Sequence, residues 1–171
     1  WCLHQKKTQY TRNFLKQLKF LNPETEIETD VDTLVNACET MGRSKTGALI
    51  VLERGQSLDF VKVTGDKMNI EINQPILESI FFKNSPLHDG AAIINNNTVV
   101  ATRVVLPLSN KDLPSRFGLR HRAAVGITEK TDALCLVVSE ETGKISYIKD
   151  GDFVLFDSTF SLVETLRSDL T

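Results

Sequence analysis

Apolar residues recur every three or four positions in several segments, which is the spacing of one helical face. This pattern predicts five helices. They begin near residues 10, 31, 74, 120 and 159, and the first ends at Asn22-Pro23. Asp30, Asn73 and either Ser158 or Thr159 are suited to cap three of them, because their side chains accept hydrogen bonds from a helix's first N–H groups.

Short runs of apolar residues between turn signals predict seven strands. The run Gly47 to Glu53 is almost continuously apolar, as in a strand buried on both faces. Asn95-Asn96-Asn97 and Asp150-Gly151 are hairpin turn sequences. The seven runs cover residues 47–53, 60–63, 91–94, 98–106, 133–138, 145–149 and 153–156.

These elements favour an α/β fold, in which a mixed sheet of about seven strands is surrounded by about five α-helices. The 171 residues are enough for one domain with a substantial core. We expect an N-terminal helical segment over 1–44, a core over 45–157 and a C-terminal helix over 158–171.

The first residues raise the question of a membrane anchor. Trp1-Cys2-Leu3 followed by Lys6-Lys7 has the composition found where a membrane helix meets the cytoplasm. The start of an ordinary helix, or residues left by cloning, would look the same. No apolar run in the sequence approaches the roughly 20 residues that span a bilayer.

Charge and cysteine content exclude two classes of function. With 20 basic and 22 acidic side chains, the net charge of −2 does not favour broad binding along nucleic acid, although one local basic cluster could hold a small anion. The three cysteines are widely spaced and form no zinc-binding pattern. Cys38 and Cys135 lie in apolar contexts and are expected to be buried, reduced thiols.

Three polar clusters next to predicted strands and helices carry candidate chemistry. In His88-Asp89-Gly90-Ala91, small residues would let a ligand approach the backbone, and the Asp89 carboxylate could bind Mg²⁺ or accept a hydroxyl proton. A simple Asp-Gly turn would explain the same residues, and in isolation this cluster favours the turn.

The second cluster, Arg120-His121-Arg122, opens a predicted helix, where N–H groups and guanidinium groups favour phosphate. Glu140, in the third cluster Ser139-Glu140-Glu141, could add a second carboxylate to a cation site, although a polar turn is the simpler interpretation. Together the clusters supply a metal site, a carboxylate for an attacking hydroxyl, and cations for a triphosphate. They indicate phosphoryl or nucleotidyl transfer without choosing the base or the product.

The segments SPLHDGAAII, FGLRHRAAVGITE and TDALCLVVSEETG closely resemble the diadenylate cyclase domain family. The likeness runs from about Lys45 to Phe156, and the N-terminal helices are closest to the membrane-associated bacterial type. The resemblance implies a mixed sheet surrounded by helices, ATP as substrate, cyclic di-AMP as product, and Mg²⁺ or Mn²⁺ as cofactor. It also implies a transient face-to-face homodimer, and a cytoplasmic domain at the inner face of the bacterial membrane.

The resemblance also implies roles for individual residues. Asp89 matches the catalytic and metal-binding aspartate, and Gly90 and Ala91 match the backbone that lines the nucleotide. His88 matches a neighbour of the metal. The remaining matches are to phosphate-binding and metal-binding positions, namely Arg120, His121, Arg122, Ser139 and Glu140.

Two positions depart from the family pattern. Leu119 stands where the family often has Thr, whose hydroxyl can contact phosphate. Val105 stands where many members have Tyr, so adenine would depend on apolar packing by Val105 and Leu106. The lost stacking would cost roughly 1–3 kcal/mol of binding free energy.

Three other functions fit the sequence less well. A nucleotide-sensing module without turnover is disfavoured by the intact Asp89 and Arg-His-Arg. A metal phosphohydrolase built on His88-Asp89 would need further histidines, and only His4 and His121 remain. A purely structural domain would leave the three polar clusters unexplained.

Overall fold

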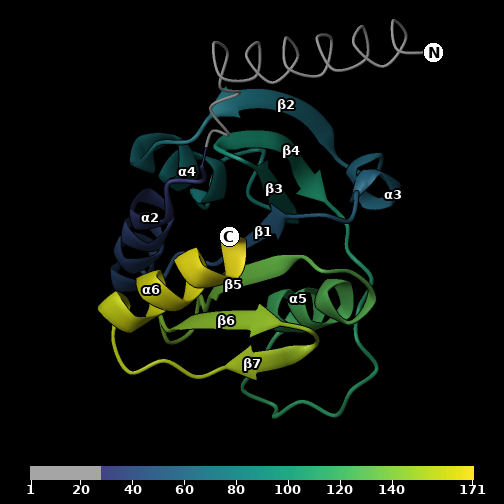
Figure 1. Ribbon diagram of the computed structural model, residues 1–171. Helices are drawn as coiled ribbons and strands as arrows, with labels where there is room; N and C mark the ends of the chain where they lie inside the picture. The colour runs from purple at the N-terminus through teal and green to yellow at the C-terminus, as the bar shows by residue number, and fades with distance from the viewer. Residues whose placement is uncertain (1–27) are drawn as a thin grey trace, which may run out of the picture.

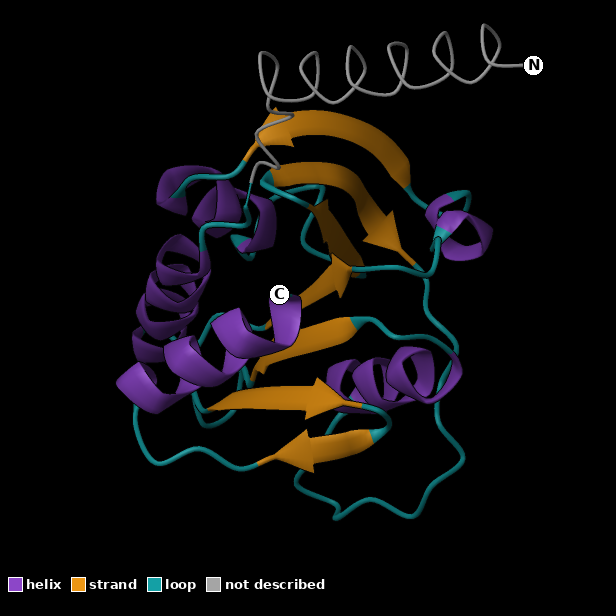
Figure 2. Ribbon diagram, viewed as in Figure 1, coloured by secondary structure: helices purple, strands orange, loops and turns teal. Residues whose placement is uncertain are grey.

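The computed structural model describes residues 28–171 as one seven-stranded sheet with helices on both faces (Figures 1 and 2). The strand order is β2-β4-β3-β1-β5-β6-β7. All neighbouring pairs are antiparallel except β1 and β3, which are parallel, so the sheet is mixed. The strands are β1 (Ala48–Glu53), β2 (Asp66–Glu71), β3 (Ala91–Asn95), β4 (Thr98–Val104), β5 (Leu134–Val138), β6 (Ile145–Lys149) and β7 (Asp152–Val154).

Five helices cover this sheet in the described part of the chain. They are α2 (Val31–Arg43), α3 (Asp59–Lys62), α4 (Gln74–Phe81), α5 (Leu119–Lys130) and α6 (Thr159–Leu170). Buried residues of α2, α4 and α6 pack on one face of the sheet, and those of α3 and α5 pack on the other. Because β1 and β5 lie between two layers of helices, every residue of both strands is buried.

The expected fold class is confirmed, and most elements lie where the sequence predicts them. Asp30, Asn73 and Ser158 cap α2, α4 and α6 through side-chain hydrogen bonds. The helix predicted over residues 10–21 lies outside the described residues. Cys38 and Cys135 are buried and free, and burial raises the pKa of the Cys38 thiol to about 12.

Two expectations about the elements are wrong. The run at 60–63 belongs to the short helix α3 and its C-cap rather than to a strand, because four residues are too few for their periodicity to distinguish a helix from a strand. Strand β2 was missed, since its sequence DKMNIE is mostly exposed at the sheet edge.

A buried carboxylate, that of Glu53, lies at the C-terminal end of β1, away from the polar clusters. Glu53 accepts hydrogen bonds from Lys62 Nζ (2.7 Å), Asn95 Nδ2 (2.7 Å) and the Leu58 amide (2.6 Å). Burial alone would raise the pKa of Glu53, but these hydrogen bonds outweigh it and hold the pKa below its ordinary value. The network fixes α3 to the ends of β1 and β3.

Candidate active site

The strand directions bring two of the three polar clusters to the same end of the central strands. Parallel strands β1 and β3 begin at this end, whereas their antiparallel neighbours β5 and β4 end there. The register pairs Ala91 with Val104 and Ala48 with Val138. The Asp89 motif before β3, Val105 after β4 and Ser139 after β5 therefore lie together at this end of the strands. We call this region the site edge.

At the start of β3, Gly90 fills a position that no other residue fits well. Its φ is +88°, in the left-handed region, and a Cβ added there would lie 2.8 Å from the Val104 carbonyl oxygen. The register between β3 and β4 shifts just after this point, and Arg103 there has a φ of +56°. The irregular end of β4 thus presses directly on Gly90 and fixes the turn that carries Asp89.

Asp89 and His88 form a pair with an unusual arrangement of acceptor atoms. His88 Nδ1 lies 2.7 Å from the Ser85 carbonyl oxygen, which can only accept, so Nδ1 carries the proton. His88 Nε2 lies 3.2 Å from Asp89 Oδ1. In the neutral imidazole a lone pair then faces a carboxylate, and a proton or a metal cation between them would satisfy both. The Asp89 side chain is 86% exposed, so a ligand can reach it.

Arg120 lies at the centre of the site edge. Its guanidinium packs so closely against Gly47 that a Cβ on Gly47 would lie 2.5 Å from Arg120 Nη1. Arg120 Nη1 is also 3.5 Å from Glu140 Oε2. Gly47 was not predicted as a site residue, because its contribution is the absence of a side chain beside an arginine far away in sequence.

The other two residues of the triplet point elsewhere. His121 is buried against Phe117, with ring centroids 4.8 Å apart. Burial, followed by the charge of Arg120, lowers the pKa of His121, so its imidazole is neutral at pH 7. Arg122 Nη1 donates hydrogen bonds to the carbonyl oxygens of Ser109 (3.1 Å) and Lys111 (2.9 Å). The structure thus brings Arg120, but not Arg122, next to Glu140.

The turn after β5 is held by its own hydrogen bonds and by a close glycine contact. Ser139 Oγ accepts from the amides of Glu141 and Thr142, which leaves the hydroxyl proton free to donate. Gly143, with φ +76°, packs back to back against Gly42 of α2. A Cβ on Gly143 would lie 2.1 Å from the Gly42 carbonyl oxygen. The contact fixes the turn that carries Ser139 and Glu140.

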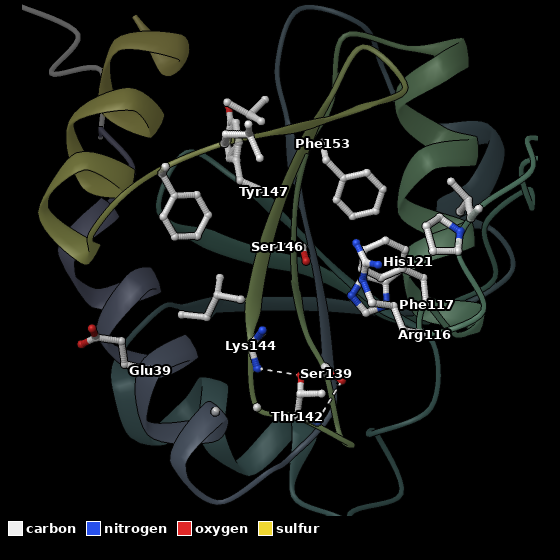
Figure 3. A pocket seen from close by; sticks show the side chains of 18 of the residues that line it. Glu39, Arg116, Phe117, His121, Ser139, Thr142, Lys144, Ser146, Tyr147 and Phe153 are labelled. Carbon is white, nitrogen blue, oxygen red and sulfur yellow. Dashed lines mark hydrogen bonds between the residues drawn. The ribbon is translucent and has the colours of Figure 1, made fainter.

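A large open cavity adjoins the site edge beyond Ser139 (Figure 3). Its volume is about 1080 Å³. Phe117, His121 and Phe153 form an aromatic wall on one side, and Lys144 and Thr142 lie near Ser139 at one end. Arg43, Arg116 and Lys144 are its basic lining residues, whereas Glu39 is its acidic one.

The three apolar positions predicted to contact adenine or phosphate differ in exposure. Leu106 is buried, whereas Val105 is 66% and Leu119 is 71% exposed. Val105 follows β4 at the site edge, and its amide donates a hydrogen bond to Thr64 Oγ1 at 2.9 Å. Leu119 is the first residue of α5 and directly precedes Arg120. Exposed apolar side chains therefore flank the polar groups at this edge.

The donor groups fit a divalent cation only if substrate completes its coordination. Within residues 28–171, no group of three or more His, Cys, Asp or Glu side chains could hold a metal ion. Asp89 offers an exposed carboxylate beside His88 Nε2, and Glu140 is held by Arg120. Mg²⁺ commonly uses one or two carboxylates together with phosphate oxygens and water, so this donor set fits it.

Comparisons with known proteins identify the family of this chain. The chain matches the DAC family model, described as "DisA bacterial checkpoint controller nucleotide-binding", over residues 35–153. It is 44% identical over 133 residues to the diadenylate cyclase CdaS of Bacillus thuringiensis, covering 77% of this chain and 65% of that protein. It is 42% identical over 123 residues to the cyclic di-AMP synthase CdaA of Bacillus subtilis, covering 71% of this chain and 45% of that protein.

Solved structures give the same result. A double mutant of DacA from Staphylococcus aureus has a TM-score of 0.78 at 40% identity, covering 82% of this chain and 94% of that one. A structure titled as a hypothetical membrane spanning protein from Bacillus cereus has a TM-score of 0.72 at 41% identity, covering 76% and 65%. The chain therefore belongs to the DAC family. It spans about 65% of the length of CdaS and 45% of that of CdaA.

Proposed function

We propose that this domain is a diadenylate cyclase, a nucleotidyltransferase that condenses two ATP molecules into cyclic di-AMP and two pyrophosphates. The observation that carries the proposal is the site edge itself. There the exposed carboxylate of Asp89 precedes β3, and Glu140 follows β5 on the other side of β1. The guanidinium of Arg120, from α5, lies beside Glu140. Relatives named diadenylate cyclase or cyclic di-AMP synthase support the same reaction.

Each site residue has a role in this reaction. Val105 and Leu106 pack against adenine, while the backbone at Gly90 and Ala91 lies along the nucleotide. Arg120 neutralises phosphate charge, and the Ser139 hydroxyl donates to phosphate. The β- and γ-phosphates extend from Ser139 towards the cavity, whose basic lining residues Arg116 and Lys144 suit them.

Asp89 acts on the attacking group. Each 3′-hydroxyl attacks the α-phosphorus of the other ATP, a P–O bond to pyrophosphate breaks, and the hydroxyl proton passes to a carboxylate or water. Asp89, with His88 and Glu140 nearby, would hold Mg²⁺ or Mn²⁺ together with the triphosphate. When bound, the cation supplies positive charge for the phosphate oxygens and lowers the pKa of a coordinated hydroxyl.

Two facing subunits complete the reaction. Because each subunit binds one ATP, two sites must meet about a twofold axis for the two 3′-hydroxyls to reach opposite α-phosphates. We propose a transient face-to-face homodimer through the site edge, with no role for nucleic acid. In the described part of the chain no helix has both the length and the apolar character to cross a bilayer. Anchoring at the inner face of the bacterial membrane remains a proposal for a longer protein.

Product analysis tests the proposed activity. The domain is incubated with ATP and either Mg²⁺ or Mn²⁺. The products are then separated, and mass spectrometry identifies and quantifies them. We expect cyclic di-AMP and pyrophosphate in a 1:2 ratio, and neither from an Asp89→Asn control. Tight ATP binding with no product at any metal or protein concentration would instead identify a nucleotide-sensing module.

A further inference from the structure

Arg122 is fixed by contacts that leave the phosphate region. Arg122 Nη1 donates hydrogen bonds to two carbonyl oxygens of the β4–α5 loop, residues 105–118. The loop also donates a hydrogen bond to the helix, from the Ser109 amide to the Arg122 carbonyl oxygen at 3.1 Å. Arg122 is therefore joined to the loop through both its side chain and its backbone.

Helix geometry explains why Arg120 and Arg122 separate. Successive residues of an α-helix turn by about 100°, so residues two apart point roughly 200° from each other. Both arginines lie in the first turn of α5. When Arg120 points to Gly47 and Glu140 at the site edge, Arg122 necessarily points to the other side of the helix.

The helix face that carries Arg122 is built to hold the loop. Gly126 lies one turn further on, and a Cβ there would be 1.9 Å from the Pro107 carbonyl oxygen. Glu129 follows after another turn and accepts a hydrogen bond from Ser109 Oγ. Spaced by four and then three positions, Arg122, Gly126 and Glu129 form one continuous stripe against the loop.

This loop carries nucleotide-binding positions at both of its ends. Leu106 lies near its start, and its last residue, Gly118, is the N-cap of α5 directly before Leu119 and Arg120. Leu106 is buried and is followed by Pro107, whose carbonyl oxygen packs against Gly126. Anything that holds the loop therefore sets where the adenine-contacting residues lie.

We propose that Arg122 is a positioning residue that places the β4–α5 loop for adenine, and that within the Arg-His-Arg triplet Arg120 alone contacts phosphate. The inference rests on the proposed nucleotide site. It corrects the simpler expectation that both arginines grip the triphosphate together. If Arg122 has this role, removing its side chain lowers the affinity for adenine ligands by the same factor whether or not they carry phosphates.

The test compares Arg122→Ala with Arg120→Ala, using two probes and one structural readout. The probes are adenosine and α,β-methylene-ATP with Mg²⁺, since the bridged analogue cannot release pyrophosphate. Calorimetry gives both affinities well below the melting temperature of each variant. Hydrogen–deuterium exchange over residues 105–118 reports whether the loop is held. Arg122→Lys serves as the conservative variant, because its ammonium can donate to the same two carbonyl oxygens.

For Arg122→Ala we expect both affinities to fall by the same factor, within about threefold, and exchange in the loop to rise. Arg122→Lys should restore part of both. For Arg120→Ala we expect the ATP analogue to lose at least about tenfold more than adenosine, with loop exchange unchanged, since charge-assisted hydrogen bonds are the stronger kind.

A selective loss of the ATP analogue in Arg122→Ala, or loop exchange equal to that of the unaltered protein, would overturn the proposal. If Arg122→Ala does not fold, the same two criteria apply to Arg122→Lys. If the unaltered domain binds neither probe, the proposed nucleotide site fails, whereas the exchange experiment still decides whether Arg122 holds the loop.

Discussion

The contact between Gly143 and Gly42 makes the turn after β5 sensitive to a single methyl group. Gly143→Ala adds a Cβ that would lie 2.1 Å from the Gly42 carbonyl oxygen, at a residue whose φ is +76°. No side-chain rotation relieves the steric overlap or the unfavourable φ, because the backbone fixes the positions of both the Cβ and the carbonyl oxygen. The turn and the end of α2 must move apart.

Two contributions set the magnitude. Placing alanine in the left-handed region costs about 1–2 kcal/mol, and overpacking of this kind costs about 1–3 kcal/mol. We expect Gly143→Ala to lower the free energy of unfolding by roughly 2–5 kcal/mol. For a domain of this size, each kcal/mol corresponds to a fall of about 2–4 °C in melting temperature, which gives roughly 4–20 °C.

Thermal unfolding followed by circular dichroism measures this effect, with Gly55→Ala as the matched control. Gly55 has no positive φ, and a Cβ there would meet only the Asp132 carboxylate at 3.1 Å. The initial rate of cyclic di-AMP synthesis should fall in Gly143→Ala as well, because the turn carries Ser139 and Glu140. If Gly143→Ala lowers the melting temperature no more than Gly55→Ala, the reasoning about the glycine contact is wrong.

Three further predictions follow from the site and the fold. Asp89→Asn should abolish synthesis while ATP affinity, measured by calorimetry, stays within about tenfold or 1.4 kcal/mol, and near-normal turnover would remove Asp89 from the reaction. Initial rate per subunit at saturating ATP and metal should rise with protein concentration until light scattering shows dimers, and a flat dilution series would contradict the face-to-face dimer. Because the pKa of Glu53 is held below its ordinary value, Glu53 should stabilise the fold above about pH 5 and lose that effect as pH falls through the lowered pKa. Urea unfolding of the domain and of Glu53→Gln from pH 3 to 7 should therefore give a difference that shrinks with acidity, and a difference independent of pH would count against it.

Much of the fold could be predicted because burial imposes a readable pattern. The stripe of α2 and the apolar run of β1 are buried as the spacing indicates. Elements with little burial gave no such pattern. Strand β2 alternates exposed and partly exposed residues at the sheet edge, and α3 has one buried residue in a single turn. The expected number of strands is nevertheless correct, because the missed β2 replaces the strand wrongly predicted at 60–63.

The site was only partly predictable for a different reason. Sequence chemistry identified Asp89, Arg120 and Glu140, but their arrangement depends on strand pairing that no local pattern encodes. In both the contact of Gly47 with Arg120 and that of Arg122 with the loop, an arginine side chain meets the backbone of another segment of the chain. A compact motif such as Arg-His-Arg suggests one shared task, whereas the helix turns its three side chains to three different surroundings.

The sheet order divides the proposed catalytic groups between two halves of the molecule. Strands β2, β3 and β4 come from one continuous stretch, and β5, β6 and β7 come from another, with β1 inserted between them (Figure 1). Asp89 belongs to the first half and Glu140 to the second, so a nucleotide bound to both residues would link the two halves across β1. Occupancy should then slow hydrogen exchange at the amide of Ile50, which pairs with Ala92 of β3 on one side and with Leu136 of β5 on the other. That amide can serve as a label-free sensor of nucleotide in the intact domain.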